Sequence, residues 1–285
     1  MSQVFDPTPC ALGEGPLWHP GREQLFWFDI LNRQLLTRSG DETRLWAFAE
    51  MASAAGWTGQ DTLLVASETA LTQVNLETGA HEVVVPLEAD NPLTRSNDGR
   101  ADPCGGFWIG TMGKGAEPGA GAIYRYYRGE VRRLFHPLTI PNAICFTPDG
   151  GHACFADTAQ GKVWRVALDA QGWPSGSPVL FLDLSAEGLN PDGAVIDAAG
   201  TLWLAQWGAG RVAAYAPDGR FLRAISFDAP HTSCPAFGGP DLTLLYCTSA
   251  RQGLSDAELA ARPHSGMTFQ IPTDTRGQRE HMVIL

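Results

Sequence analysis

The stretch NPDGAVIDAAGTLWLAQW, residues 190–207, contains the unit that decides the fold. Its second half is a DAAG turn followed by an apolar run that ends in tryptophan, which is typical of a β-strand entered from a tight turn. Its first half places a carboxylate, Asp192, between a proline and a glycine, directly before further apolar residues. The second half therefore indicates a strand, and the first half raises the question of what Asp192 faces.

Similar apolar runs recur along the whole chain. The six runs are LFWFDI (25–30), LLVAS (63–67), FWIGTM (107–112), HACFADT (152–158), LWLAQW (202–207) and LLYCTS (244–249). Their starts lie 38, 44, 45, 50 and 42 residues apart, and a spacing of about 40 to 50 residues is that of one four-stranded propeller blade. Several runs follow a turn sequence and precede an alternating strand, such as GKVWRVALDAQG. We therefore predict an all-β, six-bladed β-propeller; a generic β-sandwich is the alternative that strands and turns alone leave open.

The bulk composition supports one such domain over residues 1–285. Apolar residues make up 44% of the chain and charged residues 18%, which is enough for a packed core and too little charge for a disordered protein. One short surface helix is predicted in GLSDAELAARP, where Ser255 and Glu258 have capping-box spacing. A strand near Val4 is expected to complete the last blade beside Met282–Leu285 and so close the ring.

The charge and the cysteines restrict the partners and the compartment. With 31 acidic and 20 basic side chains the net charge is −11, and no Lys/Arg-rich run occurs, so we expect neither nucleic acid nor a membrane as partner. The first 16 residues lack the basic and apolar regions of a signal peptide, and no apolar stretch is long enough to span a bilayer. The six cysteines show no CxxC spacing, so we predict free thiols in a reducing compartment, with the cytoplasm as the location.

The repeat also indicates what Asp192 faces. The first strand of each propeller blade lines the central channel, and Glu14, Asn97, Asn142 and Asp192 each lie 11 to 13 residues before the aromatic residue of the following apolar run. These positions converge at one mouth of the channel, where two carboxylates and two amides need a cationic partner. Their oxygen atoms suit Ca²⁺ or Mg²⁺, with Mn²⁺, Fe²⁺ or Zn²⁺ as alternatives. Simple β-turn corners are the competing interpretation of these sequences.

The same residues carry a resemblance to a known family. The segments are LGEGPLW (12–18), RSNDGRADPCGGFWIGTM (95–112), PNAICFTPDG (141–150), PDGAVIDAAGTLWLAQWGAGRV (191–212) and CPAFGGPDLTLLYCTSARQGLSDAEL (234–259). In these segments the chain resembles the family of senescence marker protein (regucalcin), gluconolactonase and luciferin-regenerating enzyme. The resemblance implies a six-bladed propeller with one catalytic divalent metal, whose ligands fall on Glu14, Asn142 and Asp192.

The resemblance also implies a substrate site. The family's substrate-contacting pair falls on Arg95 and Asn97, and a glutamate in the loop after GTM corresponds to Glu117, although that loop aligns loosely. Gly106 departs from the family, which often has a basic residue there, and we expect this change to affect a turn and not the site. The nine tryptophans are expected to pack between blades, with Trp18 and Trp207 as the two that could face a channel mouth.

The implied reaction is the metal-dependent hydrolysis of a sugar aldonolactone, of glucono-, xylono-, arabinono- or galactonolactone type, to the open acid. Asp192 is then both a metal ligand and the base that takes a proton from water, while Arg95 and Asn97 offer donors to the sugar. None of the seven histidines is predicted to be a ligand, and no GxSxG motif supports a serine hydrolase. A non-catalytic calcium-binding propeller and an esterase or lactonase for apolar lactones remain alternatives. The signatures of WD and kelch interaction propellers are absent from the sequence.

Overall fold

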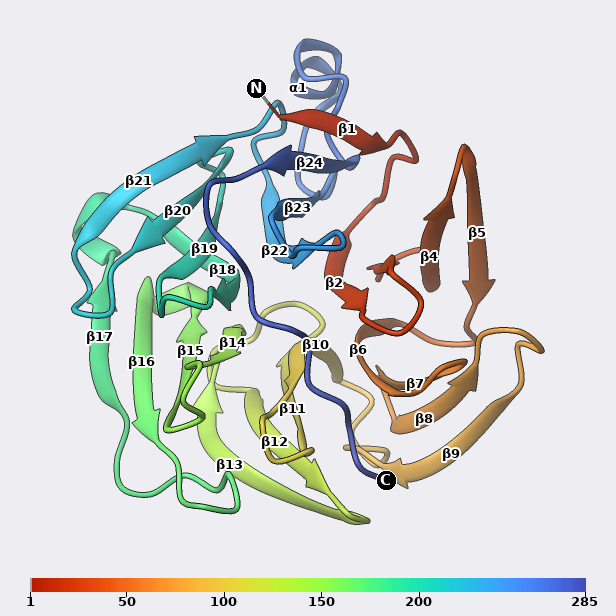
Figure 1. Ribbon diagram of the computed structural model, residues 1–285, viewed down its shortest axis with the longest axis vertical. Helices are drawn as coiled ribbons and strands as arrows, with labels where there is room; N and C mark the ends of the chain where they lie inside the picture. Colours follow the sequence, from red (N-terminus) through yellow and green to blue (C-terminus); the bar gives the residue numbers. More distant parts are fainter. Residues whose placement is uncertain (1) are drawn as a thin grey trace.

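The computed structural model describes residues 2–285 as six four-stranded antiparallel sheets around a central axis (Figure 1). The innermost strands are β2 (Gly13–His19), β6 (Ala52–Gly59), β10 (Thr94–Ala101), β14 (Pro141–Phe146), β18 (Asn190–Ile196) and β22 (Thr232–Gly238). The second strands are β3 (Gln24–Asp29), β7 (Thr62–Ser67), β11 (Phe107–Gly113), β15 (His152–Asp157), β19 (Leu202–Trp207) and β23 (Leu244–Ser249). All six second strands coincide with the six apolar runs, and this confirms the predicted six-bladed propeller.

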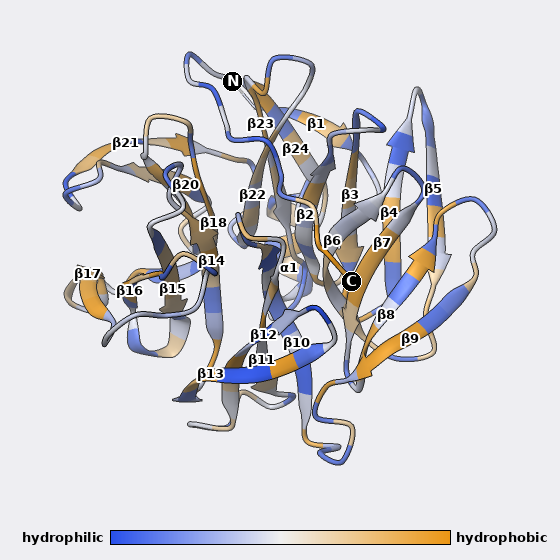
Figure 2. Cartoon of the chain, turned by 60° about the horizontal axis from the view of Figure 1, so that its bottom comes forward, coloured by the Kyte–Doolittle hydropathy of each residue, from blue (hydrophilic) through white to orange (hydrophobic). Residues whose placement is uncertain are grey.

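In five blades the outer half is a hairpin that completes the sheet, and in the last blade it is formed by strands from the two ends of the chain. The third strands are β4 (Gln34–Ser39), β8 (Ala70–Asn75), β12 (Gly121–Tyr127), β16 (Lys162–Ala167), β20 (Arg211–Tyr215) and β24 (Thr268–Pro272). The outermost strands are β5 (Glu42–Ala47), β9 (His81–Pro86), β13 (Glu130–Leu138), β17 (Val179–Asp183), β21 (Phe221–Ser226) and β1 (Gln3–Asp6). Outer strands such as β5 and β13 carry polar stretches, which are blue in Figure 2. The innermost strands of successive blades contact one another around the axis.

The last blade is closed by both ends of the chain, but with a different partner from the one predicted. Strand β1 pairs antiparallel with β24, with Val4 opposite Phe269, so the predicted pairing of the N-terminal strand with residues 282–285 is wrong. The predicted closure by an N-terminal strand is confirmed. Residues 276–285 leave the blade after β24 and cross one mouth of the channel instead (Figure 1).

This C-terminal segment is bound to several blades by backbone and side-chain hydrogen bonds. Gln278 Nε2 donates to the carbonyl oxygens of Phe146 and Ile196, the last residues of β14 and β18, over 3.0 and 2.8 Å. The backbone nitrogen of Val283 donates to the carbonyl of Trp57 at 2.9 Å. The segment therefore covers the mouth at which the innermost strands end.

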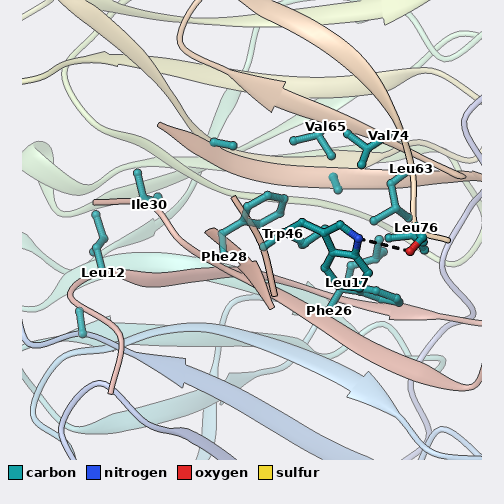
Figure 3. Packing of buried hydrophobic residues seen from close by; sticks show 14 residues of the cluster. Leu12, Leu17, Phe26, Phe28, Ile30, Trp46, Leu63, Val65, Val74 and Leu76 are labelled. Atoms are coloured by element: carbon teal, nitrogen blue, oxygen red, sulfur yellow. Dashed lines mark hydrogen bonds between the residues drawn. The ribbon is translucent and has the colours of Figure 1, made fainter. Parts of the chain in front are cut away.

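Apolar side chains fill the space between neighbouring blades. In Figure 3, Phe26 and Phe28 of β3 pack against Leu63 and Val65 of β7. Trp46 of β5 joins the same cluster and is 8% exposed; its Nε1 donates to the carbonyl of Leu76 at 3.2 Å, so its polar atom is satisfied (Figure 3). Packing of this kind fixes each innermost strand against the next one.

The remaining elements agree with the sequence. Helix α1 (Asp256–Ala261) has the predicted capping box between Ser255 and Glu258, and two 3₁₀ turns, η1 (Thr158–Gln160) and η2 (Ser185–Glu187), lie in loops. The six cysteines are free thiols, as predicted, and all but Cys104 are buried. Within residues 2–285 there is no helix whose length and apolar character suffice to cross a membrane.

Candidate active site

A backbone irregularity places four of the candidate side chains at the mouth opposite the C-terminal segment. Every innermost strand changes register against its second strand, and in four of them the shift spans a predicted site residue. The shifts lie between Glu14 and Leu17, Ser96 and Gly99, Asn142 and Cys145, and Pro191 and Ala194. A bulge of this kind re-aims a side chain that a regular pleat would direct into the sheet. The repeated bulge is why these residues reach one place on the axis.

Gly15 shows why the backbone beside Glu14 needs glycine. Its φ is +53°, in the left-handed region, and a Cβ there would lie 2.2 Å from the carbonyl oxygen of Ser53 on the next blade. Any larger residue would push the two innermost strands apart. The glycine thus lets β2 bulge while it stays in contact with β6, and the bulge presents Glu14 to the channel.

Five of the six predicted site residues line one cavity of about 800 Å³, which is the size of a small-molecule site. They are Glu14, Arg95, Asn97, Asn142 and Asp192, and each is at most 7% exposed. Glu117 is not among the residues that line this cavity; it is exposed, and its carboxylate accepts a hydrogen bond from the backbone nitrogen of Gly115 at 3.1 Å. Its predicted contact with substrate stays a prediction.

The cavity floor holds more negative than positive charge. Glu14 and Asp192 line the cavity as buried carboxyl groups, and Arg95 is the buried guanidinium that faces them. Asp98 is also buried but does not line the cavity, and Arg100 is its cationic neighbour. Burial, with repulsion from Asp98, raises the pKa of Glu14 to about 8. Burial, with repulsion from Glu14, raises the pKa of Asp192 well above its ordinary value. Burial also raises the pKa of Asp98 to about 6 and lowers that of Arg95 to about 10.

This floor fits a divalent cation. Glu14 and Asp192 place two carboxylates in the cavity against the single guanidinium of Arg95, so ionisation leaves an excess of negative charge that a cation neutralises. Within residues 2–285 no ion pair reaches Glu14 or Asp192, and Glu14 accepts only one hydrogen bond, from the nitrogen of Gly15. The Oδ1 atom of Asn142 adds a neutral oxygen donor, and such all-oxygen sets suit hard cations. No group of three His, Cys, Asp or Glu side chains that could hold a metal ion occurs in this part of the chain, so the amide is needed to complete the set.

A chain of hydrogen bonds orients the amides of the site. Arg95 Nη1 donates to Asn97 Oδ1 at 2.9 Å. Asn97 Nδ2 donates to Asn142 Oδ1 at 2.8 Å and to the carbonyl of Pro141 at 3.0 Å. Asn142 Nδ2 donates to Thr158 Oγ1 at 2.8 Å, and Thr158 Oγ1 donates to the carbonyl of Pro191 at 2.7 Å.

The polarity of this chain follows from its two ends. A guanidinium can only donate and a backbone carbonyl can only accept, so each amide between Arg95 and Pro191 has one permitted orientation. Both amide hydrogens of Asn97 are used within the protein, which leaves its Oδ1 as the atom able to take a further bond. Arg95 keeps Nε and Nη2 free of hydrogen bonds to residues 2–285. Arg95 can therefore donate hydrogen bonds to a bound molecule, whereas Asn97 can only accept them.

Three features of the cavity were not predicted as site residues. Thr158, in η1, links the amide of Asn142 to the strand that carries Asp192. Lys114 lines the rim and pairs with Glu68 of the neighbouring blade. His231 lines the wall and stacks on Trp207, one of the two tryptophans singled out in the sequence. No spacing rule points to Thr158 or His231, because each lies in a loop whose length differs from blade to blade.

Asp98, Trp18 and Gly106 have structural positions. Asp98 Oδ2 accepts the backbone N–H of Ile144 at 2.7 Å and so ties β10 to β14. Trp18 is buried and stacks on Tyr246 with 5.8 Å between ring centroids. Gly106 lies in a turn, where a Cβ would come within 2.4 Å of Asp102 Oδ2. The residue at position 106 therefore affects a turn and does not line the cavity, as expected.

The fold and this polar cluster together define a six-bladed propeller with a ligand-sized, acidic cavity at one mouth of its channel. The chain belongs to the SMP-30/gluconolactonase/LRE-like family, whose model matches residues 12–251. It is 36% identical to an L-arabinolactonase of Azospirillum brasilense, over 97% of this chain and 93% of that protein. It is 33% identical to a 6-deoxy-6-sulfogluconolactonase of Pseudomonas putida, over 95% of this chain and 94% of that protein.

A solved structure shows the same fold throughout. The calcium-binding protein regucalcin of Agrobacterium tumefaciens superimposes with a TM-score of 0.98 at 40% identity, covering 100% of this chain and 98% of the other. This likeness confirms the family that the sequence motifs indicated, and it covers every blade.

Proposed function

We propose that this protein hydrolyses the ester bond of a sugar aldonolactone, with one divalent cation held by Glu14, Asn142 and Asp192. The observation that carries the proposal is a single cavity that combines two unpaired carboxylates with Arg95, whose Nε and Nη2 are free to donate. A site for a structural ion needs neither a cavity of about 800 Å³ nor a free guanidinium beside the ion. The names of two relatives, L-arabinolactonase and 6-deoxy-6-sulfogluconolactonase, support the choice of sugar lactones.

The buried residues divide the chemistry among them. A divalent cation bound there supplies a Lewis acid for the lactone carbonyl. Asp192 takes the proton from water as the oxygen attacks the carbonyl carbon, and the proton then passes to the ring oxygen when the C–O bond breaks. Arg95 donates to the lactone or to its hydroxyls and so fixes the face that water meets. Asn97 holds Arg95 and Asn142 in place through its amide.

Proton release on an aldonolactone panel tests this function. Metal-stripped and metal-restored protein would be followed with a pH indicator on glucono-, xylono-, arabinono- and galactonolactone, with spontaneous hydrolysis subtracted. We expect acceleration that needs a divalent ion and differs among the lactones. Ca²⁺, Mg²⁺, Mn²⁺, Fe²⁺ and Zn²⁺ would be compared, because oxygen ligands accept all of them.

A second assay separates the two other functions considered for this fold. Thermal melting with each cation reports binding independently of turnover. Stabilisation by Ca²⁺ without hydrolysis of any lactone would contradict the proposal and indicate a calcium-binding propeller. Hydrolysis of apolar lactones or aryl esters in preference to every sugar lactone would instead identify a different class of ester substrate.

A further inference from the structure

One wall of the cavity is a stacked pair of rings from two blades. Trp207 ends β19, and His231 directly precedes β22. Their ring centroids are 4.2 Å apart and their planes differ by 15°. Asn190 Nδ2 donates to the carbonyl of Trp207 at 3.3 Å, which anchors the end of β19 beside the cavity. Stacking on the indole sets the plane of the imidazole.

The hydrogen bonds of His231 define its tautomer. Nδ1 lies 3.0 Å from the carbonyl oxygen of Gln252. A carbonyl oxygen only accepts, so Nδ1 carries the proton and Nε2 has the lone pair. Burial lowers the pKa of His231, which keeps the ring neutral at pH 7. The ring makes no second hydrogen bond to residues 2–285, so Nε2 is a free acceptor.

His231 faces donors from the other side of the ring of blades. It belongs to the blade of β22, and the opposite blade in Figure 1 is that of β10 and β11. From that blade Arg95 reaches the same cavity with a guanidinium that only donates, and Lys114 lines it with an ammonium that is paired with Glu68. A molecule lying between the two blades therefore meets donors at one end and an acceptor at the other.

We propose that His231 is a specificity-determining residue, whose Nε2 accepts a hydrogen bond from a hydroxyl group of the lactone. The inference rests on the proposed function and names a residue that selects its polyhydroxylated substrates. Such a substrate has hydroxyl hydrogens to donate, whereas an unsubstituted lactone has none and leaves Nε2 unpaired on binding. A site that is built to pair a hydroxyl discriminates against the analogue that lacks it.

The test compares two lactones on two histidine variants. His231→Phe keeps an aromatic ring against Trp207 and removes both nitrogens. His264→Phe is the matched control, because His264 pairs with Asp228 outside the cavity. For each protein the ratio of kcat/KM for the best sugar lactone to kcat/KM for δ-valerolactone is measured with the bound metal held constant.

We expect His231→Phe to lower this ratio about tenfold, the size of one hydrogen bond, mainly through a higher KM for the sugar lactone. His264→Phe should leave the ratio unchanged. An unchanged ratio in His231→Phe, or an equal loss on both lactones, overturns the inference while the proposed function stands. Activity of the wild-type protein on no sugar lactone removes the proposed function itself, which distinguishes the two failures. A melting temperature within about 2 °C of wild type shows that the variant is folded.

Discussion

The side-chain amides of Asn97 and Asn142 meet across two blades, where Nδ2 of Asn97 donates to Oδ1 of Asn142 at 2.8 Å. This bond joins the residue that orients Arg95 to a residue that offers an oxygen to the cation site. Since Oδ1 of an amide has two lone pairs, one remains for a metal ion. The relationship explains why two asparagines occur at equivalent places in successive blades: one supplies an oxygen atom, and the other fixes its direction.

The Thr158 hydroxyl should control the affinity for the cation. Thr158→Val removes the group that accepts from Asn142 and donates to the Pro191 carbonyl, so the amide of Asn142 keeps only the bond from Asn97 and is held less firmly. We expect divalent-cation affinity to weaken by about 10- to 100-fold, as for other residues that orient a ligand. Isothermal titration calorimetry on metal-stripped protein measures this directly.

Two further variants show whether the Thr158 effect is specific. Thr158→Ser keeps the hydroxyl and should restore most of the affinity. Thr147→Val removes a hydroxyl from a surface turn after β14, at the other end of the same innermost strand, and should bind the cation as wild type does. Equal affinity in Thr158→Val and wild type would show that the hydrogen-bond chain does not position Asn142.

Asp192→Asn should affect activity and stability in opposite directions. The change removes the proton acceptor, so lactone turnover should fall by about 10²- to 10⁴-fold, and cation binding should weaken as well. In metal-free protein it also removes a buried charge that Glu14 repels, so unfolding should cost roughly 1 kcal/mol more than in wild type. Urea denaturation with a chelator present, beside the proton-release assay, measures both effects.

Asp241→Asn is the control for Asp192→Asn, since Asp241 is exposed on a surface turn. It should change neither turnover nor unfolding. A destabilised metal-free Asp192→Asn protein would argue against this account, because it would mean that the carboxylate stabilises the empty site.

The fold could be predicted because its signal is repeated six times. Each apolar run became a second strand, and counting back from it located Glu14, Asn97, Asn142 and Asp192 at one mouth. The bulges that aim these side chains depend on backbone angles, such as the positive φ of Gly15, and not on hydrophobic period. The position of each residue within the repeat therefore predicted which side chains gather at the mouth. The bulges that direct these side chains to the axis became visible only in the structure.

The site residues that were not predicted, and the strand pairing that was predicted wrongly, depend on contacts that do not repeat along the sequence. Thr158 and His231 reach the cavity from loops, and each is recognised only by its partners in another blade. The pairing of the N-terminal strand was wrong because both β24 and the last four residues are apolar enough to be its partner. In the structure β1 pairs with β24, with Val4 opposite Phe269. The last four residues lie instead at the mouth opposite the cavity.

The C-terminal segment should contribute to stability through the buried ion pair of Arg100 with Glu280. Their side chains are 11% and 9% exposed. Glu280→Gln removes the ion-pair partner of the buried guanidinium, so we expect a loss of about 3–5 kcal/mol in the free energy of unfolding. Glu130 pairs with Arg132, and both side chains are more than half exposed. Glu130→Gln breaks this pair and should lower the free energy of unfolding by less than about 1 kcal/mol. Similar losses in the two variants, measured by urea denaturation, would show that the segment is not held by this pair.

His19, the last residue of β2, should make the protein sensitive to mild acid. Its fully buried ring donates from Nε2 to the Gly59 carbonyl at 3.0 Å and accepts at Nδ1 from the nitrogens of Gly21 and Arg22, both at 3.2 Å. A proton on Nδ1 would break the two accepted bonds, and burial lowers the pKa of His19 below its usual value of 6.5.

The sign of the pH effect follows from which state binds the proton. Below about pH 6.5 the unfolded chain protonates this histidine and the folded protein does not, so stability is lost as the pH falls. The loss has a limiting slope of about 1.4 kcal/mol per pH unit and ends at the folded pKa. His19→Asn removes the titrating group, so its unfolding free energy, measured in urea from pH 7.5 to 5.5, should decline less steeply than that of wild type. Parallel curves for the two proteins would show that His19 takes up its proton as easily in the folded state as in the unfolded one.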